Sequence, residues 1–146
     1  VSQTTLSLDD TNAIVSILYD RFPEILKPKS SDICYATQNR QDAVKQLALE
    51  SDYIIVIGSS NSSNSNRLKE LAEKCGTPSI LIDDHNELHF PALAAYKKIG
   101  VTAGASAPES LVQGVVETLC KTLNAEAIEL GENKEDIFFK LPPELR

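Results

Sequence analysis

One buried strand constrains the fold of this chain more than any other segment. Residues 53–58 read Tyr-Ile-Ile-Val-Ile-Gly, a continuous apolar and mostly β-branched run that ends at glycine. A short run of this kind, without polar alternation, is typical of a strand buried on both faces, as in a parallel sheet. Such a sheet needs helices on each side, so the segment predicts an α/β protein.

Helical and strand patterns alternate along the rest of the chain. Ser7 and two acidic residues open a first helix, which should end near Phe22-Pro23. Residues 127–128 and 137–139 flank a charged turn and predict a terminal hairpin. This alternation predicts a mostly parallel sheet with helices on both faces. Further helices are predicted around residues 43–48, 68–75 and 108–123, and further strands at 79–82 and 99–102.

Composition narrows the classes of protein. The chain of 146 residues has a formal net charge of −7, which argues against nucleic-acid or membrane-surface partners because phosphate binding needs clustered Lys and Arg. No apolar run approaches the roughly 18–20 residues that cross a bilayer. The three cysteines are widely spaced and form no disulfide framework, which predicts a reducing cytoplasm. The chain begins at Val1 and contains no Met, which indicates a trimmed or partial product.

The loop at residues 59–66 consists only of serine and asparagine. It follows the buried strand and precedes a helix, the position at which open parallel sheets bind ligands. Its hydroxyls and amides, with the free N–H groups of a helix start, would form a neutral cradle for phosphate oxygens. It is not a P-loop, because the Gly-x-x-x-x-Gly-Lys pattern is absent. The alternative is a polar turn that only caps the next helix.

A second loop of small residues, 102–109, has the same position between a strand and a helix. Ser106 and Glu109 fit a capping box, and Pro108 suits a first helical turn. The small residues would let a ligand approach the backbone closely. Taken alone, the pattern is also that of a well-capped helix without a ligand. Two such loops at one sheet edge favour a shared anion site.

Cysteine and histidine are the remaining candidates. Cys34 precedes a helix whose N-terminus would favour a thiolate, although one cysteine holds neither a cluster nor a zinc ion. A buried structural thiol is the alternative. Cys75 and Cys120 lie on apolar helix faces and are predicted to be in the core. His85 and His89 have the spacing of a helical metal site, but their segment is typical of a surface loop.

Four motifs occur together in one order. Residues 2–7 read SQTTLS, 32–41 DICYATQNRQ, 58–68 GSSNSSNSNRL and 100–109 GVTAGASAPE. They closely resemble the 4-hydroxy-3-methylbut-2-enyl diphosphate reductase family, also called IspH or LytB, over essentially the whole chain. The resemblance implies three α/β lobes around a 4Fe–4S cluster, each lobe supplying one cysteine. This chain would be a C-terminal fragment with two of the parallel-sheet lobes, approximately residues 1–85 and 86–146.

The resemblance also implies an activity and a set of residues. The family removes the hydroxyl of an allylic diphosphate with two electrons and two protons, and it forms isopentenyl and dimethylallyl diphosphate. An electron-donor protein such as ferredoxin or flavodoxin is the implied partner. By matching positions, Cys34 would be a cluster ligand, and Thr4 a catalytic residue that positions substrate or relays a proton. The matching substrate-binding residues are Thr37, Ser62, Ser63, Asn64 and Ser106.

The chain departs from the family pattern in what it lacks. The other cluster cysteines, the substrate-binding histidines and the catalytic glutamate have no counterpart here, and His85 and His89 do not match them. Ser2 stands where the family more often has Thr. The fragment alone is therefore expected to be inactive. Two alternatives stay open: a stand-alone diphosphate-binding or regulatory module without the redox lobe, and a structural domain whose loops only cap helices.

Overall fold

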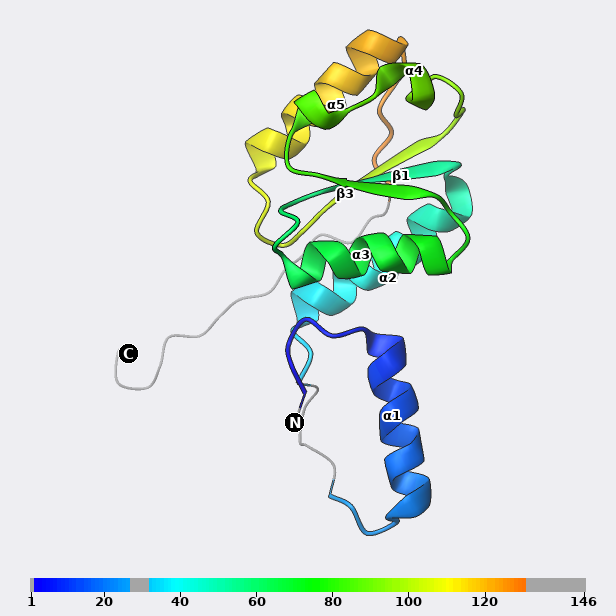
Figure 1. Cartoon of the computed structure of the whole chain (residues 1–146), viewed down its shortest axis with the longest axis vertical. Helices are drawn as coiled ribbons and strands as arrows, with labels where there is room; N and C mark the ends of the chain where they lie inside the picture. The colour runs from blue at the N-terminus through cyan, green and yellow to red at the C-terminus, as the bar shows by residue number, and fades with distance from the viewer. Residues whose placement is uncertain (1, 27–31, 131–146) are drawn as a thin grey trace, which may run out of the picture.

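The computed structural model describes residues 2–26 and 32–130 of the chain. These residues form a mixed α/β structure in which a parallel sheet is covered by helices on both faces (Figure 1), as the sequence predicts. The elements are α1 (Leu8–Arg21), α2 (Tyr35–Glu50), β1 (Tyr53–Ile57), α3 (Ser63–Lys74), β2 (Ser79–Ile82), η1 (His85–Glu87), α4 (Phe90–Leu93), β3 (Ile99–Ala103) and α5 (Glu109–Leu123).

The sheet has three strands in the order β2-β1-β3, and both pairings are parallel. Ile57, the last residue of β1, lies opposite Ile82 of β2 and Ala103 of β3. All three carboxyl ends therefore meet at one edge of the sheet. The chain leaves β1 toward β2 on one side and returns to β3 on the other, so the strand order reverses beside β1. Ligands of open α/β sheets bind at this kind of position.

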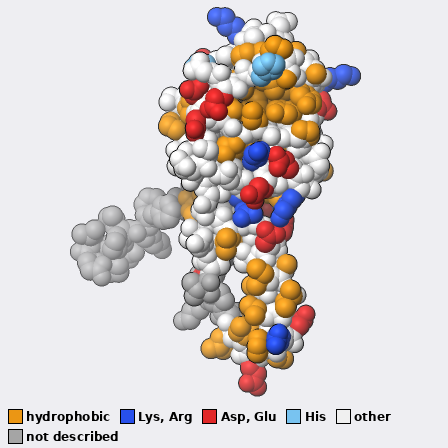
Figure 2. Space-filling model, viewed as in Figure 1, with side chains coloured by type: hydrophobic (Ala, Val, Ile, Leu, Met, Phe, Trp, Pro, Cys, Tyr) orange, Lys and Arg blue, Asp and Glu red, His pale blue; other side chains and the backbone are white. Residues whose placement is uncertain are grey.

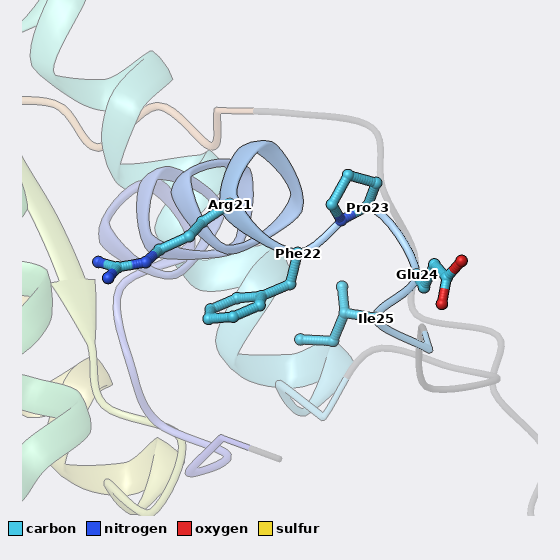
Figure 3. A pocket seen from close by; sticks show the side chains of 5 residues that line it. All are labelled: Arg21, Phe22, Pro23, Glu24 and Ile25. Carbon is cyan, nitrogen blue, oxygen red and sulfur yellow. The ribbon is translucent and has the colours of Figure 1, made fainter.

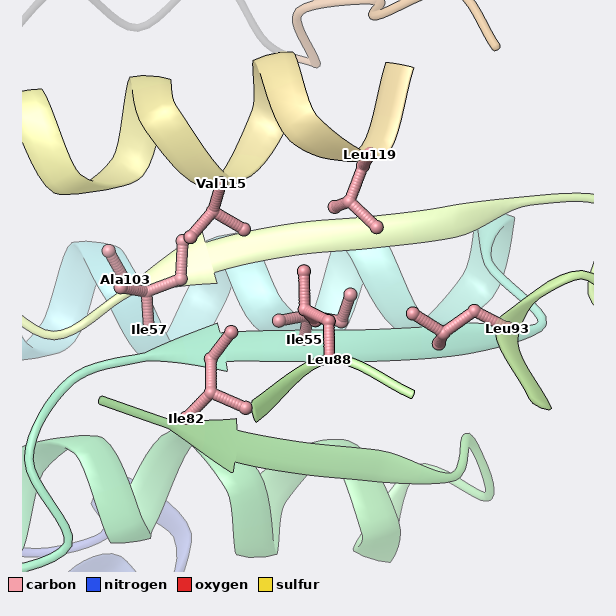
Figure 4. Close-up of a cluster of buried hydrophobic side chains, with 8 residues drawn as sticks. All are labelled: Ile55, Ile57, Ile82, Leu88, Leu93, Ala103, Val115 and Leu119. Carbon is pink, nitrogen blue, oxygen red and sulfur yellow. The ribbon is translucent and has the colours of Figure 1, made fainter. Parts of the chain in front are cut away.

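The central strand β1 builds the core on both faces of the sheet, because successive side chains of a strand point in opposite directions. Ile54 and Val56 pack with α2 and α3 on one face, whereas Ile55 and Ile57 pack with α5 on the other (Figure 4). All four are fully buried, which agrees with the prediction from the unbroken apolar run. The helical partners of β1 are Val44, Ala48, Leu68, Leu71 and Ala72 on the first face, and Val115 and Leu119 on the second.

Helix α1 is attached to the rest of the structure mainly at its first turn. Lys45 Nζ lies 2.9 Å from Asp9 Oδ1, and Lys74 Nζ lies 3.2 Å from Asp10 Oδ1. The helix has no buried residue. Hydrophobic side chains lie along this part of the surface (Figure 2), and Ile14 and Ile17 are 60% and 65% exposed. Residues 21–25 line a shallow pocket where the helix ends (Figure 3).

The boundaries of several elements differ from prediction. The first helix ends where expected, but α3 begins at Ser63, inside the segment predicted to be a loop. Residues 127–128 are not in a strand, and 137–139 lie outside the described residues. No helix within the described ranges is both long and apolar enough to cross a membrane. The division of the chain into lobes stays a prediction.

The prediction that both later cysteines lie in the core is wrong. Cys75 is exposed at the C-cap of α3, and the chain turns toward β2 at Gly76, whose φ is +91°. Cys120 is only half-buried. The inward face of α3 ends one turn earlier, at Leu71 and Ala72.

The ion pair of Asp10 predicts a pH-dependent attachment of α1. The hydrogen bond from Lys74 lowers the pKa of the Asp10 carboxyl below its ordinary value of 3.8. A lowered pKa stabilises the folded state fully above that ordinary value, and the stabilisation is lost as pH falls through the folded-state pKa. Asp10→Asn should therefore lower the thermal unfolding midpoint slightly at neutral pH, and the difference from wild type should shrink as pH falls through the folded-state pKa of Asp10.

Circular dichroism against temperature measures this difference, and Asp20→Asn on the same helix is the matched control. Asp20 makes no ion pair with any other described residue. Both partners of the Asp10 pair are about half exposed, so added salt should shrink the effect. An Asp10→Asn midpoint that differs from wild type equally at neutral and acidic pH would contradict the prediction.

Candidate functional site

The turn after β1 and the start of α3 form the first part of the candidate site. Ser62 is the N-cap of α3, and its Oγ accepts a hydrogen bond from Ser65 N at 3.3 Å. Asn66 Nδ2 donates to the carbonyl oxygens of Ser60 and Ser62 at 2.7 and 2.9 Å. Serine and asparagine side chains thus order this turn and cap the helix, as the alternative interpretation of the loop expects.

Capping leaves donors at the start of α3 without partners. Within residues 2–26 and 32–130, the amide N–H groups of Ser63 and Asn64 donate to no protein acceptor. Asn64 is 7% exposed, and neither its side-chain oxygen nor its nitrogen has a hydrogen-bond partner in the described structure. A buried amide without partners is costly, so it marks a place where a polar ligand or water is needed. The two backbone donors lie at the positive end of the helix dipole, which favours an anion.

Ser65 joins this turn to the end of β3. Its side chain is fully buried between Gly58 and Gly104. A Cβ atom at either glycine would lie 2.3 Å from Ser65 Oγ, so neither position tolerates a side chain without a shift. Gly104 N also donates to Ile57 O at 2.8 Å. The close approach therefore holds the loops after β1 and β3 side by side. The sequence predicts that the two loops share one sheet edge, but not that Ser65 packs between them.

The turn from β3 to α5 carries Ser106, but the predicted capping box is wrong. Pro108 is the N-cap of α5, and no side chain caps this helix. Ala107 N donates to Gly104 O at 3.0 Å, so a turn separates Ser106 from the helix and leaves its side chain exposed. Glu109 lies 3.5 Å from the Gln113 side chain along the helix instead of reaching back. The Ser106 hydroxyl is thus exposed rather than used as a cap.

Cys34 is the N-cap of α2, and it is exposed. Its N–H donates to Thr4 O at 3.2 Å, so the segment with Thr4 runs beside the start of this helix. Thr4 is exposed, whereas Thr37, one turn into α2, is 4% exposed. The buried Gln41 side chain holds the same segment, accepting from Leu8 N at 3.0 Å and donating to Leu6 O at 2.9 Å. Cys34 is therefore not the buried structural thiol that was the alternative.

Arg40 connects α2 with the end of β3. Its Nη1 donates to Ala103 O, at the end of β3, at 2.9 Å. Arg40 lies inside the second sequence motif, residues 32–41, but no sequence pattern assigns it a role; its only signal is one basic residue three positions after Thr37. Contacts thus connect the predicted residues through three links: Thr4 with Cys34, α2 with β3, and Gly104 with Ser65.

The two histidines belong to two different short elements after β2. His85 begins η1 and His89 is the N-cap of the short α4, so they are not on one helix. Asp84 accepts from Asn86 N at 2.6 Å and Glu87 closes the capping box, which uses both acidic side chains in local structure. In the part of the chain that the structure describes, no three His, Cys, Asp or Glu side chains are grouped to hold a metal ion.

A cavity of about 650 Å³ lies at the opposite end of the sheet, where α2 and α5 end and β3 begins. It is lined largely by apolar residues together with Lys97 and Lys98. None of the predicted site residues lines it. Its position makes it a different feature from the polar loops at the carboxyl edge.

The fold and these loops define an α/β protein with polar, anion-favouring loops at the carboxyl edge of a parallel sheet. A family model described as LytB protein matches residues 1–120, and the chain belongs to this family.

The relatives carry consistent names. The chain is 58% identical to a 4-hydroxy-3-methylbut-2-enyl diphosphate reductase of Saccharophagus degradans and 53% identical to one of Idiomarina loihiensis. Both matches cover all of this chain, but only 47% of the first relative and 46% of the second. A solved reductase structure from Plasmodium falciparum is 36% identical, has a TM-score of 0.89, and is matched over 99% of this chain and 46% of that one. The chain spans about half the length of the curated relatives it matches.

The packing of Ser65 predicts a specific pattern of rescue. Gly104→Ala should destabilise the protein by about 1–3 kcal/mol, because its new Cβ meets Ser65 Oγ. Ser65→Ala removes that oxygen and leaves Ser65 Cβ at 3.5 Å, an ordinary contact, so the double variant should regain most of the stability. Ser65→Ala alone should cost little, since its Oγ has no hydrogen-bond partner in the described structure.

Gly58→Ala is the matched comparison. Its Cβ would still lie 3.0 Å from the Cβ of residue 65 after Ser65→Ala, and Gly58 has a φ of +157°, which side chains rarely adopt. Ser65→Ala should therefore restore only part of the stability that Gly58→Ala removes. Urea unfolding of the three single and two double variants measures both effects. Equal rescue at Gly58 and Gly104, or none at Gly104, would show that Ser65 is not wedged between the two loops.

Proposed function

We propose that this chain is the C-terminal half of a 4-hydroxy-3-methylbut-2-enyl diphosphate reductase and supplies that enzyme's diphosphate pocket and one ligand of its 4Fe–4S cluster. The observation that carries the proposal is the buried, unpartnered side chain of Asn64, one residue after the unpaired N–H of Ser63. Relatives that match the whole chain are named as this reductase.

The diphosphate would be held by hydroxyls, amides and backbone donors rather than by a cluster of cations. Ser62, Ser63 and Asn64 contribute from the start of α3, and Ser106 contributes from the turn after β3. Hydrogen bonds from such groups to an ionised phosphate are short and roughly twice as strong as neutral ones. The wedge formed by Gly58, Ser65 and Gly104 would keep the two loops at the separation that one ligand needs.

The chain fits the cluster as the donor of one thiolate. Cys34 is exposed at the positive end of α2, which favours a negatively charged ligand, and no three metal-binding side chains are grouped together among the described residues. The remaining ligands would come from the part of the relatives' length that this chain does not span. When bound, the cluster would supply the two electrons that, with two protons, replace the substrate hydroxyl by hydrogen and release water.

The two threonines would act between these groups. Thr4, beside Cys34 through its backbone, would position the substrate or relay one of the protons with its exposed hydroxyl. Thr37 is buried one turn into α2, where its hydroxyl would line the substrate side of the helix. Electrons would come from a donor protein such as ferredoxin or flavodoxin, in a reducing cytoplasm that keeps the three cysteines as thiols.

The proposed ligand role of Cys34 predicts that replacing Cys34 lowers iron content and turnover, whereas replacing Cys75 does not. In protein of the relatives' full length, reconstituted without oxygen, Cys34→Ser should lower iron content and abolish most turnover, because a serine hydroxyl is a poor soft-metal ligand. Cys75→Ser is the control, since this thiol is also exposed but lies at the end of α3. Iron analysis and the cluster's visible absorbance measure the effect. Full cluster content in Cys34→Ser would remove the proposed ligand.

The pocket role of Asn64 predicts weaker diphosphate binding without loss of the cluster. Asn64→Ala should weaken the binding of inorganic diphosphate by about ten-fold, the effect of losing one or two charge-assisted hydrogen bonds. Asn61→Ala in the same turn is the control, because Asn61 is exposed and only its backbone N–H bonds, to Ser59 Oγ. Calorimetry measures both. Equal weakening in the two variants would count against a pocket built around Asn64.

Two measurements separate the proposal from its alternative, a stand-alone diphosphate-binding or regulatory module. They are diphosphate binding by the isolated chain and substrate turnover by the full-length protein. The module requires the isolated chain to bind diphosphate without iron at low micromolar concentration, whereas the reductase requires the full-length protein to turn over its substrate. The free donors at the start of α3 are common to both.

A further inference from the structure

Arg40 is a cation without a countercharge at the carboxyl edge of the sheet. The side chain is half-buried, its Nε–H is buried without a partner, and its Nη1 bonds only the neutral carbonyl of Ala103. Among the residues that the structure describes, no carboxylate lies within ion-pair distance of the guanidinium. A guanidinium stays charged at every physiological pH, so this position carries an uncompensated positive charge.

The contact of Arg40 spans two elements that carry site residues. Helix α2 bears Cys34 at its N-cap and Thr37 in its first turns. Ala103 is the last residue of β3, directly before Gly104, whose backbone packs on Ser65. The turn that follows carries Ser106. Without the hydrogen bond from Arg40 to Ala103 O, the β3–α5 turn would therefore no longer be held against α2.

We infer that Arg40 is a positioning residue: it holds the β3–α5 turn against α2, and its unneutralised charge favours a polyanion at this edge of the sheet. The inference rests on the proposed function, because it assigns Arg40 to the diphosphate site of that reaction. Arg40 acts on the site in two ways. Its hydrogen bond to Ala103 O positions the turn, and the electric field of its charge is effective over several ångströms where water is partly excluded. The most affected quantity is therefore the affinity for diphosphate rather than the chemical step.

Calorimetry with inorganic diphosphate and metal-free, full-length protein tests the inference. Arg40→Met removes both the charge and the hydrogen bond, and it should weaken binding by about ten-fold or more. Arg40→Gln keeps a donor for the Ala103 carbonyl but no charge, and it should weaken binding by at least about three-fold. Lys45→Met is the matched control, because it removes one charge from the same helix where Asp9 already neutralises it; its affinity should stay within about two-fold of wild type.

Steady-state kinetics of the reconstituted protein separates positioning from a general structural role. Both Arg40 variants should raise KM in proportion to the calorimetric loss, with kcat within about three-fold and iron content unchanged. Wild-type diphosphate affinity in folded Arg40→Met would overturn the inference. Should Arg40→Met fail to fold, wild-type affinity in Arg40→Gln would overturn it equally. A wild-type protein that binds diphosphate but turns over no substrate would refute the proposed function alone, and the affinities of the variants would still decide on Arg40.

Discussion

The burial of β1 on both faces is the constraint on which the rest of the structure depends. Ile54 and Val56 require α2 and α3 on one side, and Ile55 and Ile57 require α5 on the other. A strand that is apolar at every position can only be central, so β2 and β3 must pair on its two edges. This arrangement brings the turns after β1 and β3 to one edge, with strand order reversing between them. The position of the candidate site thus follows from the packing of one strand.

The alignment of the two loops at the site depends on close backbone contacts. Ser65 fits between Gly58 and Gly104 because neither glycine has a side chain, and this fit aligns the start of α3 with the turn before α5. Capping by Ser62 uses one N–H of the helix, and two others have no acceptor within residues 2–26 and 32–130. These donors at the positive end of the helix dipole favour an anion.

The sequence was sufficient for the order of elements and for the sheet edge, because both depend on periodicity and on glycine and proline positions. It was insufficient where a tertiary contact competes with a local pattern. Ser106 and Glu109 fit a capping box, but the Gly104–Ala107 turn takes Ser106 out of reach of the helix. Ser63 to Asn66 have low helix propensity, yet the Ser62 cap makes them the first turn of α3. The contact between Arg40 and Ala103 joins residues 63 positions apart, which no local pattern reveals.

The same structure supports the proposal that the chain supplies only part of a catalytic site. A diphosphate pocket requires a few donors on adjacent loops, and one parallel sheet can supply them from its own edge. A 4Fe–4S cluster requires several thiolates around one centre, but here a single cysteine caps α2, and the described residues contain no group of three His, Cys, Asp or Glu side chains that could hold a metal ion. The exposed apolar face of α1, with Ile14 and Ile17, is a further surface that this part of the chain does not cover. In the proposed reductase, substrate binding and electron supply would therefore belong to different parts of the fold. The hydrogen bonds from Arg40 to Ala103 and from Cys34 N to Thr4 O would keep the proposed pocket and the Cys34 helix in a fixed relation.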